Sequence, residues 1–188
     1  MVYRFSKRLF DIVCAFIGIV GTSPVWIFSI IATLLSDWGP LFYFANRVGK
    51  DNKQFKMWKF RSMRVAKEAN EASLRPDQDR IFWWGRVMRR LKIDELPQLI
   101  NIFRGDMSIV GPRPAIPREV EQYSDYEKQR LYVTPGLTCY WQIQPRRNDL
   151  TFEEWLELDL KYIKERSFWV DWKIIFGTVK AVFGMQGV

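Results

Sequence analysis

The pattern of hydrophobic and polar residues divides the chain into an apolar amino-terminal part and a longer mixed part. Between Leu9 and Leu35 the only charged residue is Asp11, and an apolar run of this length can cross the hydrocarbon core of a membrane as a helix. Ser23-Pro24 interrupts the run near its centre, where proline removes a backbone hydrogen bond and clashes with the preceding turn. Each half then extends only about 16–18 Å, which is too short to cross a membrane alone.

Basic residues flank both ends of this apolar run, and such residues mark the cytoplasmic side of a membrane helix. A straight span would place one of the two clusters on the opposite side. The pattern therefore favours a re-entrant membrane helix over residues 1–36, bent at Ser23-Pro24, with a simple span as the alternative. The Ser23 hydroxyl is the nearest partner for the backbone groups freed at the bend. The flanking cations are Arg4, Lys7 and Arg8 before the run and Arg47, Lys50, Lys53, Lys56, Lys59, Arg61, Arg64 and Lys67 after it.

The remaining residues, 37–188, contain shorter and more polar elements. Two strand-like pieces surround a turn at residues 49–52, and residues 118–133 have the composition of a solvent-facing helix. Residues 168–185 interleave Trp, Phe, Ile and Lys, which fits either an interfacial amphipathic helix or a helix packed in the core. We therefore predict an α-rich α+β fold: a re-entrant membrane helix, interfacial amphipathic helices and a small cytoplasmic domain with minor strand content.

Composition narrows the classes of partner and chemistry. A formal net charge of +8 indicates an anionic partner, such as nucleic acid, an anionic membrane surface or a phosphorylated small molecule. Nine tryptophans and an aromatic share of 16% favour the membrane surface. The chain has no histidine, which excludes Ser-His-Asp triads and histidine metal ligands. Cys14 and Cys139 provide neither a disulfide framework nor a zinc spacing.

An acidic pair, Asp94-Glu95, lies between a basic run and a segment with helical spacing. The spacing places Asp94 at or just before the helix N-terminus, where free N–H groups lower the pKa of a carboxylate and attract phosphate. Ordinary helix capping is the alternative explanation. Adjacent helical residues diverge by about 100°, so we expect the two carboxylates to have different roles. The helical segment is defined by Leu96, Pro97, Leu99, Ile100, Phe103 and Gly105.

Arginines flank the acidic pair in the sequence, with Arg89 before it and Arg113 after it. A phosphate next to an ionised Asp94 requires arginines or Mg²⁺ to neutralise its oxygens. Arg113 lies in the run Gly111–Pro114, where two prolines fix the backbone. That run is therefore either a phosphate-binding loop or only a rigid turn.

Ordered motifs extend over nearly the whole chain, and they resemble those of the bacterial sugar transferase family, specifically the small monotopic phosphoglycosyl transferases. The densest match contains the acidic pair and the run with Arg113. The motifs are KRLFDI (7–12), TSP (22–24), NRVG (46–49), MWKFRSM (57–63), LKIDELPQLINIFRGDMSIVGPRP (91–114), VTPGLTCYWQI (133–143) and LELDLKYIKERSFWVDWKII (156–175).

The resemblance implies an enzyme of the bacterial inner membrane whose catalytic domain, residues 37–188, lies on the cytoplasmic face. Such an enzyme transfers a sugar-1-phosphate from a UDP-sugar to polyprenyl (undecaprenyl) phosphate and releases UMP. In this family the aspartate of the pair, here Asp94, is the nucleophile that forms a phosphosugar intermediate. Glu95 is its partner, and Mg²⁺ is the expected cofactor at the two carboxylates.

The resemblance also assigns phosphate-binding positions to Lys59, Arg89 and Arg113. Relatives usually read QVNGRN or QVSGRN where this chain has QIQPRRN. Arg146 and Arg147 are therefore both candidates for a further phosphate contact, with Arg147 favoured because Asn148 follows it.

Two other classes of function fit part of the pattern. A nucleic-acid binder would explain the charge and the aromatic residues but not the broken apolar run, so we expect no nucleic-acid partner. A non-catalytic adaptor that binds anionic membrane lipids would explain the anchor and its basic flanks. It would leave Asp94 and Glu95 as a helix cap.

Overall fold

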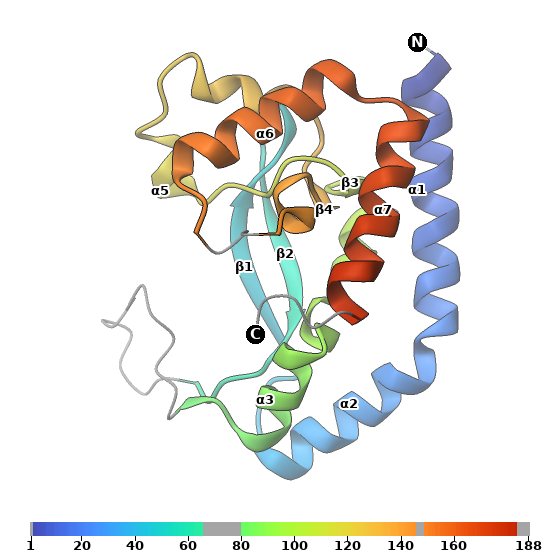
Figure 1. Ribbon diagram of the computed structural model, residues 1–188. Coiled ribbons are helices and arrows are strands. Elements are labelled where there is room, and N and C mark those ends of the chain that lie inside the picture. Colours follow the sequence, from blue (N-terminus) through green and yellow to red (C-terminus); the bar gives the residue numbers. More distant parts are fainter. Residues whose placement is uncertain (1, 66–79, 146–148, 184–188) are drawn as a thin grey trace.

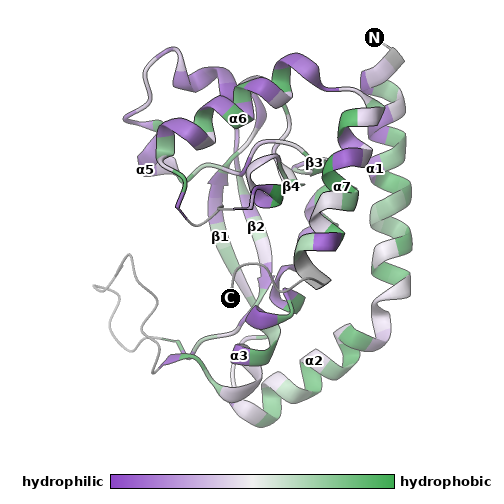
Figure 2. Ribbon diagram, viewed as in Figure 1, coloured by the Kyte–Doolittle hydropathy of each residue, from purple (hydrophilic) through white to green (hydrophobic). Residues whose placement is uncertain are grey.

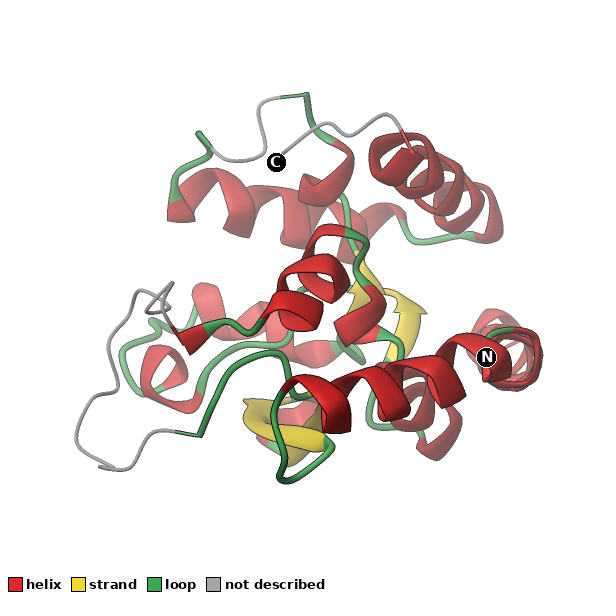
Figure 3. Cartoon of the chain, turned by 90° about the horizontal axis from the view of Figure 1, so that it is seen from below, coloured by secondary structure: helices red, strands yellow, loops and turns green. Residues whose placement is uncertain are grey.

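The computed structural model describes residues 2–65, 80–145 and 149–183. Helices form most of the described chain, and its strands make two small sheets (Figure 1; Figure 3). This agrees with the predicted α-rich α+β class. The helices are α1 (Val2–Gly21), α2 (Ser23–Ser36), α3 (Trp83–Arg90), α4 (Gln98–Arg104), α5 (Pro117–Val120), α6 (Phe152–Glu165) and α7 (Phe168–Phe183). The strands are β1 (Phe42–Val48), β2 (Gln54–Phe60), β3 (Ser108–Val110) and β4 (Gly136–Thr138).

The hairpin predicted around residues 49–52 is present as the antiparallel pair β1 and β2. Tyr43 lies opposite Lys59 in its register, and directly opposed residues share one face of a sheet. Arg47 lies four residues after Tyr43, so it projects from that same face. The second sheet pairs β3 with β4 in parallel. It brings the segment before Gly111 alongside the segment that begins at Gly136.

α1 and α2 meet at a bend of 57°, at the predicted Ser-Pro break. Pro24 lacks the N–H that would donate to the carbonyl of Val20, four residues earlier. The Ser23 hydroxyl donates to that carbonyl instead, at 2.7 Å. The Thr22 hydroxyl similarly donates to the carbonyl of Gly18, at 2.6 Å. The predicted role of Ser23 at the bend is thus confirmed. The Thr22 hydroxyl adds a second bond to a carbonyl that already accepts the Thr22 N–H, at 2.9 Å.

Apolar side chains cover the outward faces of α1 and α2, whereas α5 and α6 are mostly hydrophilic (Figure 2). Within the described residues, no helix by itself has both the length and the apolar composition needed to cross a membrane. α1 and α2 taken together meet both conditions, but with the bend between them. The exposed apolar residues are Phe5, Leu9, Val13, Phe16, Ile17 and Val20 on α1, and Val25, Ile27, Phe28, Ile31 and Leu35 on α2.

The opposite face of α1 carries buried polar residues that bind the domain. Lys7 Nζ donates to Asp11 Oδ1 and to Ser108 Oγ, both at 2.6 Å. Asp11 Oδ1 also accepts the backbone N–H of Ile109 at 3.0 Å. Because Ser108 and Ile109 belong to β3, this buried ion pair fixes α1 against the second sheet.

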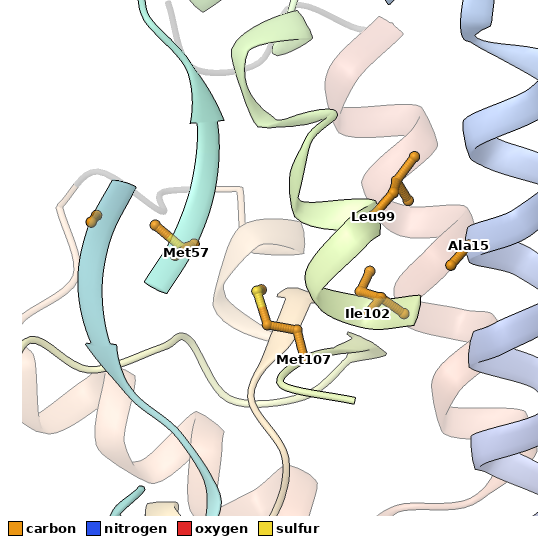
Figure 4. Close-up of a cluster of buried hydrophobic side chains, with 6 residues drawn as sticks. Ala15, Met57, Leu99, Ile102 and Met107 are labelled. Carbon is orange, nitrogen blue, oxygen red and sulfur yellow. The ribbon is translucent and has the colours of Figure 1, made fainter. Parts of the chain in front are cut away.

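Arg8 connects α1 to the end of α4. Its guanidinium donates to the carbonyls of Ile102 and Phe103 at 2.6 and 2.8 Å. A cation is favourable there because the last carbonyls of a helix carry partial negative charge. A hydrophobic cluster packs between α1, α4 and the hairpin (Figure 4), and it consists of Ala15, Ala45, Met57, Leu99, Ile102 and Met107.

α7 (Phe168–Phe183) has two different faces. The buried face agrees with the predicted core-packed helix, and the interfacial helix stays a prediction with which the exposed apolar face is compatible. Asp171 and Ile174 are buried, and Asp171 accepts hydrogen bonds from the hydroxyls of Tyr162 at 2.8 Å and Tyr3 at 3.1 Å. These contacts tie α7 to α6 and to α1. The outer face exposes apolar side chains, namely Trp169, Trp172, Phe176 and Val179.

The prediction of one solvent-facing helix over residues 118–133 is wrong. α5 ends at Val120, and a separate 3₁₀ segment, Glu127–Tyr132, follows. The break occurs because the Glu127 carboxylate accepts hydrogen bonds from the N–H and the hydroxyl of Ser124. Such local bonds compete with helix formation. Arg130, in the 3₁₀ segment, is buried rather than solvent-facing.

We predict that Gly85→Ala destabilises the fold and that Gly21→Ala does not. A Cβ at Gly85 in α3 would lie 2.0 Å from the carbonyl oxygen of Ser62, whereas a Cβ at Gly21 would meet nothing within 4 Å. Because the clash is with backbone, we expect a loss of about 1–3 kcal/mol or more. Thermal unfolding of both variants in one detergent, followed by tryptophan fluorescence, checks this. Equal melting temperatures would contradict the close approach of α3 to Ser62.

Candidate active site

Asn101 of α4 docks this helix against the edge of β2. Its side-chain Oδ1 accepts the N–H of Trp58 at 2.9 Å, and its Nδ2 donates to the carbonyl of Lys56 at 2.8 Å. The Asn101 side-chain amide thus forms the two backbone hydrogen bonds that a neighbouring strand would otherwise form with β2. Asn101 is fully buried, and the sequence interpretation missed it because its polar side chain carries no charge. Its contacts fix β2, and with it Lys59, relative to the turn before α4.

Asp94 lies in the 3₁₀ turn Ile93–Glu95, one turn before α4. Its side chain is only 8% exposed, and its buried Oδ1 has no hydrogen-bond partner within the described parts of the chain. The N-cap residue of α4 is Pro97, without a side-chain cap hydrogen bond. Helix capping therefore does not account for Asp94.

Burial raises the pKa of Asp94 above the ordinary value, and the Glu95 carboxylate raises it further. The charges of Lys59, Lys92 and Arg89 oppose this rise without cancelling it. The expectation that a helix N-terminus lowers this pKa is therefore wrong. Asp94 precedes the helix in a poorly solvated turn, so loss of hydration dominates.

Glu95 has the opposite electrostatic state. Burial is the largest single effect and disfavours its charged form, but the cations together outweigh it and lower the pKa of Glu95. Lys59 acts through its charge and its hydrogen bond, and Lys92 and Arg113 act through their charges. Lys59 Nζ donates to Glu95 Oε1 at 3.0 Å. The two neighbouring carboxylates thus differ in pKa and in partners, and their different roles stay a prediction that this difference favours.

A small pocket, here called the cationic pocket, opens beside Glu95 and brings together predicted site residues from distant parts of the sequence. Lys59 comes from β2, Glu95 from the turn before α4, and Arg113 from the loop after β3. Its lining residues are Arg47, Met57, Lys59, Glu95, Gln98, Arg113, Pro114, Gly136, Leu137, Cys139 and Gln142.

The backbone of the second sheet positions the loop that carries Arg113. Gly111 N–H donates to the carbonyl of Thr138 at 3.0 Å, and Gly136 N–H donates to the carbonyl of Pro112 at 2.8 Å. A Cβ on Gly136 would lie 2.1 Å from the nitrogen of Gly111, so this close approach requires glycine. The run is therefore a rigid turn, and it also directs Arg113 into the cationic pocket.

Arg113 and Arg47 place two guanidinium groups in one pocket. Burial lowers the pKa of Arg47, and the charge of Arg113 lowers it further. Within the described residues, neither guanidinium forms an ion pair with a carboxylate. The two guanidinium groups repel each other, and the Glu95 carboxylate of the pocket is already paired with Lys59. The pocket is therefore a favourable environment for an anion with several charged oxygens.

Arg47 was not predicted as a site residue, although the sequence contained a signal for it. The turn at residues 49–52 sets the hairpin register, and that register puts Arg47 on the same face as Lys59. Lys92 was missed too. It adopts a left-handed φ of 59°, which is uncommon for a residue with a side chain, two positions before Asp94.

The other predicted phosphate-binding residues have different outcomes. Arg89 lies in the last turn of α3, where its charge acts on Asp94 and its guanidinium contacts Met63 Sδ at 3.7 Å. It does not line the cationic pocket. Arg146 and Arg147 lie outside the described residues.

The carboxylates of Asp94 and Glu95 fit a magnesium ion whose other ligands are phosphate oxygens and water. No cluster of three or more acidic or cysteine side chains within the described ranges could hold a metal alone. Asp94 and Glu95 still provide two adjacent carboxylates, and Asp94 Oδ1 has no hydrogen-bond partner in the part of the chain that the structure describes. Mg²⁺ is usually bound by one or two carboxylates together with substrate phosphate oxygens and water.

A larger groove of about 480 Å³ lies beside the hairpin tip, between the hairpin and the α5 region. It is lined by the carboxylates Asp51, Glu121 and Asp125 and by only one cation, Lys128, among its charged side chains. This charge balance does not suit a diphosphate. The smaller cationic pocket, which holds Glu95 and Arg113, is therefore the better candidate for the active site.

Comparison with known proteins identifies the family. The family description "Bacterial sugar transferase" matches residues 2–185. A galactosyl transferase of Streptococcus agalactiae serotype III is 40% identical over 196 residues, covering 96% of this chain and 43% of the relative. The UDP-glucose:undecaprenyl-phosphate glucose-1-phosphate transferase of Escherichia coli K12 is 40% identical over 186 residues, covering 95% and 40%. An uncharacterized sugar transferase of Bacillus subtilis is 38% identical over 182 residues, covering 97% and 89%.

The chain thus spans less than half the length of the first two relatives and most of the third. Because the family match includes the apolar helices, the acidic pair and the cationic pocket, the chain belongs to the bacterial sugar transferase family.

Proposed function

We propose that this protein transfers a sugar-1-phosphate from a UDP-sugar to polyprenyl phosphate and releases UMP, through a covalent intermediate on Asp94. The observation that carries the proposal is the buried Asp94 carboxylate. One of its oxygens has no hydrogen-bond partner among the described residues, and its neighbour Glu95 lines the cationic pocket. The Escherichia coli relative is named for glucose-1-phosphate transfer from UDP-glucose to undecaprenyl phosphate, which supports this class of reaction.

The proposed reaction consists of two displacements at one phosphorus atom. An Asp94 carboxylate oxygen attacks the phosphorus that bears the sugar, and UMP leaves with the electron pair of the broken phosphorus–oxygen bond. A phosphate oxygen of polyprenyl phosphate then attacks the same phosphorus and releases Asp94 as a carboxylate. The soluble donor and the lipid acceptor use one small site in turn. A carboxylate with few hydrogen bonds loses little solvation when it attacks.

The cations of the pocket neutralise the diphosphate of the donor. Arg47 and Arg113 carry forked donors suited to phosphate oxygens, and Lys59 adds a point charge while it keeps Glu95 ionised. Asp94 and Glu95 would hold Mg²⁺ together with the phosphates. The ion would add positive charge at the oxygens where negative charge develops.

We propose that this site lies at a bacterial cytoplasmic membrane, with the catalytic residues on the cytoplasmic face, and the exposed apolar side chains of α1 and α2 support this. We propose that α1 and α2 form a re-entrant helix, because the Ser23 hydroxyl satisfies the carbonyl freed by Pro24 without water. Trp38, just after α2, and Trp169 on α7 are 85% and 86% exposed. Such indole rings suit the boundary between lipid and water.

The topology generates a first prediction. Single cysteines at Arg4 and Lys53, in a chain with Cys14 and Cys139 replaced by alanine, should both react with a membrane-impermeant maleimide only from the cytoplasmic side. Both positions are exposed, so replacement should not disturb packing. Labelling of Arg4→Cys only from the opposite side would show that α1 and α2 span the membrane. Pro24→Ala restores a backbone donor and should shift part of the population toward that state.

The covalent role of Asp94 generates a second prediction. Without acceptor, the wild type should release up to about one equivalent of UMP from the UDP-sugar, and Asp94→Asn should release none. Glu95→Gln should keep this burst but slow it, since Glu95 is paired with Lys59. Steady turnover by Asp94→Asn, or a strict requirement for polyprenyl phosphate, would replace the covalent mechanism with direct transfer.

The raised pKa of Asp94 adds a stability readout for the same variant. A carboxyl group whose pKa is higher in the folded state stabilises the fold at low pH, and it loses that contribution as the pH rises through the folded pKa. At neutral pH the wild type therefore carries a desolvated charge that Asp94→Asn lacks. The variant should melt no lower than the wild type at pH 7, and its relative advantage should shrink as the pH falls. A lower melting temperature for Asp94→Asn at pH 7 would contradict this.

The role of Arg113 generates a further prediction. Arg113→Lys keeps one charge but loses the forked donor, so the KM for the UDP-sugar should rise about 10- to 100-fold with little change in melting temperature. Arg104→Lys, on the exposed end of α4 outside the pocket, is a matched control. Unchanged kinetics in Arg113→Lys would leave the run Gly111–Pro114 as a structural turn only.

A further inference from the structure

α6 contacts the Arg113 loop through a buried ion pair that lies outside the cationic pocket. Arg130 Nη2 donates to Asp159 Oδ2 at 2.6 Å and also approaches the backbone carbonyl of Arg113 at 3.4 Å. Arg130 Nη1 donates to the hydroxyl of Tyr123 at 2.8 Å. Arg130 is 6% exposed and Asp159 is 1% exposed. Arg130 therefore connects α6 to the backbone of the residue assigned to phosphate binding.

The same helix also contacts the side chain of Arg113. Trp155 lies one turn before Asp159 on α6, and its ring stacks with that of Trp141 at 5.0 Å between centroids. The Arg113 guanidinium carbon lies 5.5 Å from the Trp141 ring and 5.8 Å from the Trp155 ring. A guanidinium over an aromatic face is attracted to it and restricted in orientation. α6 thus fixes Arg113 at both its backbone and its side chain.

The ion pair between Arg130 and Asp159 is a poor source of stability. Both groups are removed from water, and buried Arg130 Nε and Asp159 Oδ1 have no partner within the described ranges. Burying two charges is expensive, and incomplete hydrogen bonding leaves part of that expense uncompensated. Apolar residues of similar volume commonly serve stability equally well. The contact that an apolar replacement could not provide is the one to the Arg113 carbonyl.

We propose that Arg130, Asp159 and Trp155 are positioning residues that hold the Arg113 guanidinium in the orientation that binds the donor diphosphate, an inference that rests on the proposed function. None of the three lines the cationic pocket. They act through Arg113, because they fix the orientation of its guanidinium group in the protein without bound nucleotide. Preorganisation of this kind increases affinity by reducing the ordering that binding requires.

The test measures binding of UDP by titration calorimetry, so that it does not depend on turnover. Asp159→Asn should weaken UDP binding about tenfold, because the neutral amide holds Arg130 less firmly. Glu157→Gln is the matched control on the same helix, because Glu157 is exposed and, among the described residues, accepts a hydrogen bond only from the Tyr126 hydroxyl, at 2.8 Å. It should bind UDP like the wild type.

A double-mutant cycle distinguishes positioning from general support of the fold. In an Arg113→Ala background, Asp159→Asn should change UDP affinity less than twofold, because the residue through which it acts is absent. Independent losses that multiply in the double variant would overturn the proposal. So would wild-type affinity in Asp159→Asn. If Asp159→Asn folds poorly, Arg130→Lys replaces it in the cycle, since a single ammonium cannot hold Asp159, Tyr123 and the Arg113 carbonyl together.

Kinetics add a readout that a structural role would not change. In the acceptor-free UMP burst, positioning variants should keep the amplitude and lose rate at low donor concentration. In separate steady-state assays with acceptor, the KM for polyprenyl phosphate should be unchanged. Loss of amplitude alone would indicate fewer folded molecules and would contradict positioning. A wild type that binds no UDP would refute the proposed function itself. A wild type that binds UDP while Asp159→Asn binds it equally well would refute only the positioning inference.

Discussion

Two hydrogen bonds from Arg8 to the last carbonyls of α4 connect the apolar amino-terminal helix to the helix that follows the acidic pair. α4 in turn holds β2 through Asn101, and β2 brings Lys59 to Glu95. A shift of α1 against the domain would therefore move the carboxylates and their nearest cation together. This continuous set of contacts fixes the depth of the site relative to the apolar surface, which matters if one substrate is a lipid.

Neighbouring carboxylates acquire different chemistry here because the protein surrounds them differently. Asp94 is buried, and within the described ranges one of its oxygens has no hydrogen-bond partner, whereas Glu95 is paired with Lys59. Burial raises the pKa of the first, and cations lower the pKa of the second despite burial. Two adjacent acids with separated pKa values can serve as nucleophile and as cation-bound partner on one short turn. The peptide sequence Asp-Glu alone would allow either order.

The sequence predicted those features that depend on local rules. The Ser23-Pro24 bend follows from the missing proline donor, and the hairpin follows from its turn residues, so both are found as expected. Features that depend on long-range packing were not predictable. The pKa of Asp94 depends on how deeply its turn is buried, and the place of Arg47 in the pocket depends on a hairpin register that periodicity alone does not give. The pairing of β3 with β4, which aims Arg113, joins segments separated by more than twenty residues.

Ion pairing with a carboxylate distinguishes the arginines that stabilise this fold from those available to a ligand. Arg61 binds Asp37 at the end of α2, and Arg130 binds Asp159, so their charges are already neutralised by the protein. Arg47 and Arg113 are held close together in a pocket whose carboxylate, Glu95, is paired with Lys59. Holding two unneutralised cations together opposes folding, and a bound diphosphate would relieve that repulsion. A net charge of +8 indicates that the chain favours anions. The pairing of individual arginines with carboxylates of the protein indicates where an anion would bind.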